Sequence, residues 1–178
     1  MDPRITLIET NVHWLQQALR LLDRVDDNSY PTSPAGMSPH RPGGHLRHVI
    51  EFFQAFLDGL HSGVVDYDAR RRDPEIERSR TAAAAAIRRV IHALETTQAL
   101  RLEANVWVRL EDASARNVSD SLMHSSISRE LQVLSSHTIH HFALMAMTLR
   151  LHGVEMDPAF GMAPSTLRYL ASRTEVAA

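Results

Sequence analysis

The sequence predicts an all-α protein with four long helices and a short β-hairpin between the third and the fourth. Apolar residues recur every three or four positions along four long segments, as they do on one face of a helix. Proline and glycine gather between these segments. The stretch from Val106 to Leu110 instead has a period of two, with Val106, Val108 and Leu110 on one side and Trp107 and Arg109 on the other, which is typical of a strand.

Composition narrows the functions that the chain can have. Its 178 residues suit a single domain spanning 1–178. The chain has no cysteine and no lysine, which excludes thiolate ligands, Schiff-base chemistry and a P-loop. A net charge of -2 gives no indication of a nucleic-acid partner or a membrane-surface partner. We see neither a secretory signal nor an apolar run long enough to span a membrane, and we expect a soluble, cytoplasmic protein.

The first half of the chain is expected to form two helices. The first runs from Asp2 to Val25, with Pro3 at a helix start, where its missing N–H does no harm. The connection 26–44 is rich in proline and glycine, and it either walls a site or simply crosses over. The second helix, from His45 to Gly63, carries an apolar stripe of Leu46, Val49, Ile50, Phe53, Phe56 and Leu57.

The second half is expected to contribute two further long helices. The third runs from Pro74 to Leu100 through an alanine run with strong helix propensity. Between 101 and 119 the chain forms either a small hairpin, returning through 117–119, or an irregular crossover. The fourth helix runs from Ser125 to Gly153, a glycine typical of a helix end. A short last helix is expected from 165 to 171.

The fourth helix carries a pair of histidines that could share a metal ion. His137 and His141 are four residues apart, so their side chains lie on one face of the helix. The alternative is that they are surface histidines, or core histidines bonded to neighbours. His48 lies beside the apolar stripe of the second helix, which would aim it at the bundle interior, where a buried imidazole needs a partner. His140 lies off the shared face and is expected to be a bystander.

Other residues near this pair allow two interpretations. Glu130 lies two turns before His137, where it could orient a ligand or act as a catalytic base. Its alternative role is to stabilise the positive end of the helix dipole. Trp107, Phe142 and Tyr169 are expected to be exposed apolar residues. Together with the methionines around the fourth helix they could form a homodimer face, and core packing explains most of them equally well.

Three local sequences, taken together, resemble the DinB/YfiT-like superfamily. They are GGHLRHV from Gly43 to Val49, DYDARRRD from Asp66 to Asp73, and SRELQVLSSHTIHHFALMAMTLRLHG from Ser128 to Gly153. The resemblance spans nearly the whole chain and implies a four-helix bundle with up-down-down-up connectivity. It also implies a divalent metal held by three histidines, here His48, His137 and His141. His45, one turn from His48, could replace it as a ligand or contact a ligand without binding the metal itself.

Three imidazoles without a thiolate suit a transition metal such as zinc or nickel better than magnesium or calcium. Three protein ligands leave a position for water or substrate, as in catalytic zinc sites. We therefore expect a metal-dependent enzyme of the hydrolase or thiol transferase type, with unknown substrate. Some relatives use a low-molecular-weight thiol, so such a thiol or another small molecule is an expected partner. The alternative is a non-enzymatic metal-binding or stress-response bundle that acts as a homodimer.

Overall fold

The computed structural model describes residues 3–97, 104–109 and 122–176, and these are mostly helical with a small three-stranded sheet. The helices are α1 (Pro3–Leu22), α2 (Pro42–Gly59), α3 (Pro74–Arg78), α4 (Arg80–Thr96), α5 (Ile127–Leu151) and α6 (Pro164–Val176). The strands are β1 (Val64–Asp66), β2 (Asn105–Arg109) and β3 (Leu122–Ser126). Within these ranges, no helix is long and apolar enough to cross a membrane.

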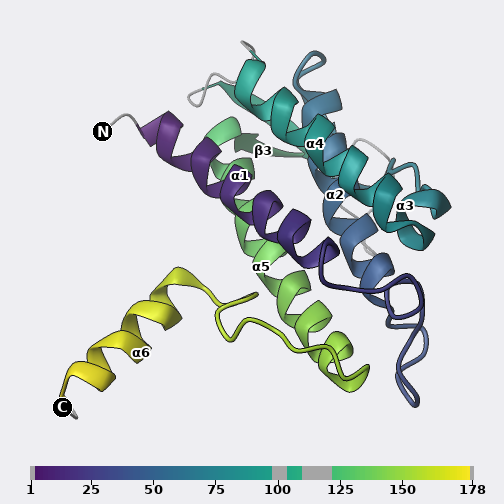
Figure 1. The fold of residues 1–178 in the computed structure, drawn as a ribbon. Helices are drawn as coiled ribbons and strands as arrows, with labels where there is room; N and C mark the ends of the chain where they lie inside the picture. Colours follow the sequence, from purple (N-terminus) through teal and green to yellow (C-terminus); the bar gives the residue numbers. More distant parts are fainter. Residues whose placement is uncertain (1–2, 98–103, 110–121, 177–178) are drawn as a thin grey trace.

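Four helices pack against one another around the core. Helix α5 lies against α1 and α2, and α4 lies against the same two helices. In Figure 1, α1 and α5 descend in chain direction while α2 and α4 ascend, and α6 stands away from this body. The core is built from the predicted apolar stripes, with fully buried side chains such as Leu15, Leu46, Phe53, Ile87 and Leu131.

The sheet contains a strand at the predicted position, β2, and two strands, β1 and β3, at positions that were not predicted. Strand β2 pairs antiparallel with β3, with Trp107 opposite His124, and parallel with β1. The return strand directly precedes α5, whereas the expected return at 117–119 lies outside the described residues. Strand β1 was missed because three residues are too few to show an alternating pattern.

The helix predicted from Pro74 to Leu100 is divided in the structure. Ser79 adopts an extended backbone between α3 and α4, and its hydroxyl accepts the Ala82 N–H at 3.2 Å. Asp73 caps α3 in the same way, accepting the Glu75 N–H at 2.9 Å. A serine side chain competes well for backbone N–H groups at a helix start, which explains the break within a run of good helix formers.

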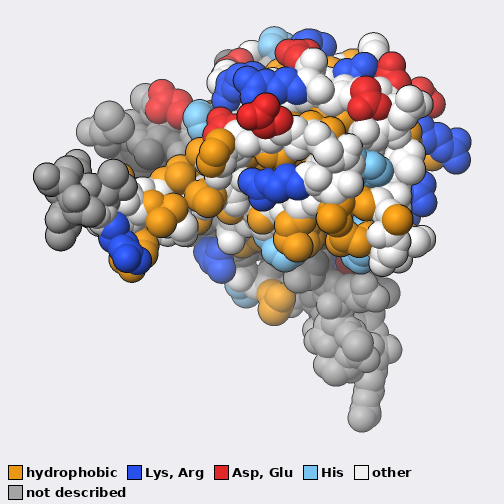
Figure 2. All heavy atoms as spheres, turned by 60° about the horizontal axis from the view of Figure 1, so that its bottom comes forward, with side chains coloured by type: hydrophobic (Ala, Val, Ile, Leu, Met, Phe, Trp, Pro, Cys, Tyr) orange, Lys and Arg blue, Asp and Glu red, His pale blue; other side chains and the backbone are white. Residues whose placement is uncertain are grey.

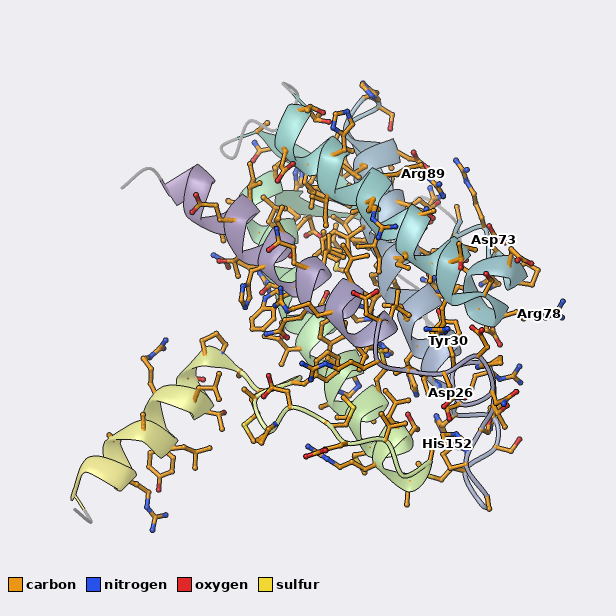
Figure 3. The ribbon with its side chains drawn as sticks, viewed as in Figure 1. Asp26, Tyr30, Asp73, Arg78, Arg89 and His152 are labelled. Atoms are coloured by element: carbon orange, nitrogen blue, oxygen red, sulfur yellow. The ribbon has the colours of Figure 1, made fainter. Side chains whose placement is uncertain are left out.

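The connection between α1 and α2 is anchored to α3 rather than left as a free crossover. The buried Tyr30 donates its hydroxyl proton to the Ile76 carbonyl at 2.7 Å, and its own carbonyl accepts the Gly43 N–H at 2.9 Å. Asp26 closes a turn by accepting two backbone N–H groups, from Asn28 and Ser29, both at 2.8 Å. Figure 3 shows Tyr30 and Asp26 on this connection, with His152 of the α5 end beside it.

Gly43 allows α2 to start directly against α3. A Cβ added at Gly43 would lie 2.1 Å from the Glu77 carbonyl oxygen, a backbone atom that cannot move aside cheaply. We therefore expect Gly43→Ala to lower the free energy of unfolding by about 3 kcal/mol, the upper end of typical overpacking costs. Urea unfolding followed by circular dichroism measures this change.

Gly44→Ala is the matched control. A Cβ there would meet first the flexible Arg41 side chain, at 3.1 Å. Alanine also favours a helix more than glycine does, so we expect a change within about 1 kcal/mol. Equal destabilisation by the two substitutions would contradict a specific close approach at Gly43.

The exposed apolar side chains only partly match the proposed dimer face. Trp107 and Tyr169 are exposed, as are Met123, Met147, Leu151 and Leu170. The expectation that Phe142 is exposed is wrong: it is fully buried and stacks on Phe160, with ring centroids 4.7 Å apart. On the face shown in Figure 2, hydrophobic side chains are scattered among charged ones.

Candidate metal centre

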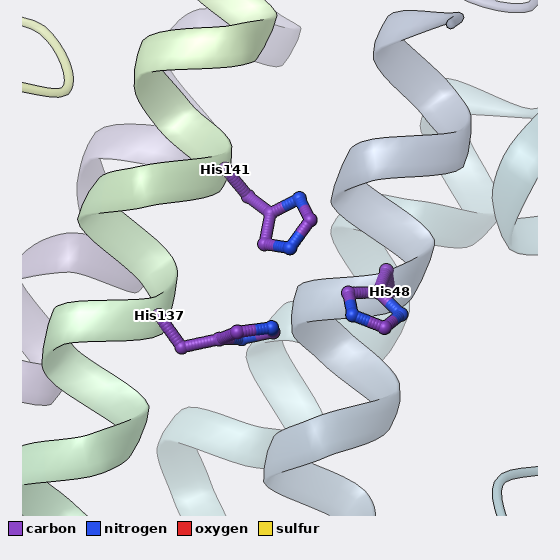
Figure 4. Close-up of side chains that lie close together, drawn as sticks. All are labelled: His48, His137 and His141. Atoms are coloured by element: carbon purple, nitrogen blue, oxygen red, sulfur yellow. The ribbon is translucent and has the colours of Figure 1, made fainter. Parts of the chain in front are cut away.

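Helices α2 and α5 bring three histidines together. His48 comes from α2, and His137 and His141 come from adjacent turns of α5, with all three rings facing one another (Figure 4). Each residue offers a ring nitrogen within 4.8 Å of the others, a spacing that one metal ion could bridge. Within the described ranges this is the only group of three or more histidines or carboxylates with such geometry.

The three imidazoles are held in their neutral form. Burial and the neighbouring His141 lower the pKa of His48 to about 4. Burial and His48 lower the pKa of His137 to about 4, and burial and His137 lower the pKa of His141 to about 3. A neutral imidazole keeps a lone pair available, and this is the form that binds metals.

An unsatisfied atom also indicates that the cluster fits a metal. His137 Nδ1 is buried and has no hydrogen-bond partner among the described residues. Buried polar atoms normally have a hydrogen-bond partner. A buried polar atom without one calls for an explanation, such as a bound ion. Three neutral nitrogens and no thiolate match the donor preferences of zinc and nickel.

His45 lies beside the cluster rather than within it. Its Nδ1 is 3.1 Å from His141 Nδ1, so one of the two nitrogens donates a hydrogen bond to the other. This contact favours a supporting position, since outer partners of this kind orient metal-binding histidines. His40, from the preceding connection, stacks on His45 with ring centroids 5.7 Å apart, and sequence reasoning gave His40 no role. His140 is exposed, as expected for a bystander.

Phe52 forms one wall of the candidate metal centre. The sequence analysis had assigned no function to this residue. Its ring stacks on His137, with centroids 4.0 Å apart, and lies 4.7 Å from the His48 ring. Its position one helical turn after His48 was the available signal. Tyr67 stacks on Phe52 at 4.8 Å, and the Arg70 guanidinium lies 4.7 Å from the centroid of the Phe52 ring.

Glu130 is buried but does not contact the three histidines. It accepts hydrogen bonds from the Tyr67 hydroxyl at 2.8 Å and the Ser125 hydroxyl at 2.5 Å. Burial, followed by the negative charge of Glu130, raises the pKa of Tyr67 well above its usual range. Glu130 therefore ties the start of α5 to Tyr67, which in turn stacks on Phe52 behind His137.

Comparisons with known proteins place this chain in no family. No family model matches it, and no solved structure matches it. A stretch of 111 residues is 32% identical to FK506-binding protein 5 of Rhizopus delemar. This stretch covers 60% of the present chain and 28% of the fungal protein, so the similarity concerns a minor part of that relative.

Proposed function

We propose that this protein is a divalent-metal-dependent enzyme of the DinB/YfiT-like superfamily, of the hydrolase or thiol transferase type. The observation that carries the proposal is the group of three imidazoles whose nitrogens lie within 4.8 Å of one another. The proposal includes a four-helix bundle with up-down-down-up connectivity. The packing and directions of α1, α2, α4 and α5 support that classification.

His48, His137 and His141 would hold the metal, with zinc or nickel the best matches to three neutral nitrogens. A metal bound there would supply Lewis-acid chemistry at a position that the protein leaves open. His45 would keep His141 oriented through their contact at 3.1 Å, and Phe52 would fix the plane of His137 by stacking. Because the chain has no cysteine, thiol chemistry would need a low-molecular-weight thiol as partner.

Metal analysis of untagged protein tests this proposal. We expect about one zinc or nickel ion per chain by mass spectrometry after exhaustive dialysis, because three preformed neutral ligands form a strong site. A tag-free chain is needed since a purification tag of histidines binds the same metals. Metal content well below one ion per chain, even after reloading with zinc, nickel or cobalt, would refute the proposal.

A non-enzymatic metal-binding homodimer is the second candidate function. The observation that favours it is the set of exposed apolar residues Trp107 and Met123 on the sheet and Met147 and Leu151 on α5. Cobalt-loaded protein separates the two candidates. A visible spectrum that changes on addition of a thiol supports an open, reactive site, and an unchanged spectrum together with a dimer in sedimentation velocity supports the second candidate.

A further inference from the structure

An open pocket lies directly beside the three histidines. His48 and His141 form part of its lining, and the rest comes from 39–41, from the start of α2 and from Glu77 of α3. Its volume of about 340 Å³ is within the range of pockets that hold small molecules. A molecule in this pocket would therefore lie next to two of the three residues proposed to hold the metal.

The charged residues that line this pocket, taken together with Glu51, which pairs with one of them, have no net charge before a metal is bound. Glu77 pairs with Arg41 at 3.0 Å and with Arg47 at 2.9 Å, and Arg47 also pairs with Glu51 at 3.2 Å. These two guanidinium groups and two carboxylates cancel. A divalent ion held by three neutral imidazoles would then give the pocket a positive charge that favours an anionic ligand.

Arg41 has donors left to bind such an anion. Its guanidinium carries five N–H donors, and among the described residues its only ion-pair partner is Glu77. Its side chain is 39% exposed, so a ligand can reach it. A planar guanidinium matches the geometry of a carboxylate, with which it can form two parallel hydrogen bonds.

The start of α2 reinforces this preference. Arg41 precedes the helix without a side-chain cap, and Pro42 has no N–H. The Gly44 N–H has no hydrogen-bond acceptor among the described residues, and Gly44 lines the pocket. The positive end of an 18-residue helix thus lies at the pocket beside Arg41.

We propose that this pocket binds a small carboxylate-bearing molecule, held by Arg41 and the start of α2, with a second donor atom of the molecule on the metal. This inference rests on the proposed function, because it needs the metal to be bound. It adds the chemical class of the ligand and a specificity-determining residue, Arg41.

Glycolate is a suitable probe, since it carries one carboxylate and one hydroxyl group, and glycolamide is its neutral counterpart. Untagged cobalt-loaded protein is titrated with each compound while the visible absorption is followed. We expect a saturable spectral change with glycolate and none with glycolamide. Arg41→Gln should weaken glycolate binding by about tenfold or more, as expected when a charged hydrogen-bonding partner is lost.

Arg78→Gln is the matched control, because Arg78 is exposed on α3 and does not line the pocket. It should leave the affinity for glycolate unchanged. If the wild-type protein takes up no cobalt, the proposed function itself fails, and the ligand proposal fails with it. If cobalt binds but glycolate causes no saturable change, or glycolamide acts equally, or folded Arg41→Gln binds glycolate normally, only the ligand proposal is overturned. Should Arg41→Gln fail to fold, the comparison of glycolate with glycolamide on wild-type protein decides.

Discussion

Replacing His141 by alanine is expected to abolish stoichiometric metal binding. His141 lies between the other two ligands and His45, with ring centroids 4.5 Å from His137 and 4.7 Å from His48. Removing it leaves two nitrogens, too few for a site that keeps a metal through dialysis. We expect affinity to fall by more than about a hundredfold, beyond the loss typical when an outer supporting residue is removed. Competition with a chromogenic chelator measures the affinity directly.

His140→Ala provides the matched control on the same helix. His140 is adjacent in sequence and is an exposed histidine, so it tests whether any histidine loss on α5 has the effect. Its metal content should equal that of the wild-type protein. Full retention of metal in His141→Ala would show that the metal is held elsewhere, and equal metal loss in both variants would show that the loss is not specific to the proposed ligand.

Only the part of the site that lies on a single helix could be predicted from local sequence patterns. The spacing of His137 and His141 requires them to share a face, wherever α5 packs. His48 meets these two residues only because α2 lies against α5, and no local sequence pattern predicts that packing. The expectation that His48 joins the pair came from the resemblance to a family. Phe52 was assigned no function because its contact with His137 joins two helices that are distant in sequence, although its position one turn after His48 was a local signal. His40 lies only five positions before His45, but no periodic pattern predicts how the irregular connection before α2 places it.

The fold shows the same division between local and distant causes. The long helices followed from apolar periodicity, whereas strand β1 exists because β2, more than 40 positions later, pairs with it. Phe142 was misjudged because the ring that covers it, Phe160, belongs to a segment beyond the end of α5. Apart from the break at Ser79, which has a local cause, predictions failed where a partner distant in sequence decides burial or pairing.

The metal-free protein is expected to lose stability steeply between about pH 6.5 and pH 4. In the unfolded chain the histidines take up protons below the ordinary pKa of 6.5, while in the fold His48, His137 and His141 have pKa values of about 4, 4 and 3. The unfolded state therefore binds more protons throughout this window, so the free energy of unfolding falls as the pH falls. Each unit of lowered pKa corresponds to about 1.4 kcal/mol, and the total loss should reach several kcal/mol.

Urea unfolding midpoints of chelator-treated protein at pH 7, 6, 5 and 4.5 measure this dependence. Hydrogen bonds from Ser29 and Asn28 lower the pKa of Asp26 to about 2. Asp26 therefore changes the stability only below this pH range, and the change within the range comes from the histidines. His141→Ala should flatten the dependence, since it removes one half-buried imidazole and a source of repulsion for His48, whereas His140→Ala, which leaves all three imidazoles in place, should flatten it much less. A midpoint that stays constant from pH 6.5 to 4.5 would mean that the imidazoles can take up protons within the fold. The cluster would then be an ordinary hydrated group of histidines, without the neutral, preformed ligands on which tight metal binding depends.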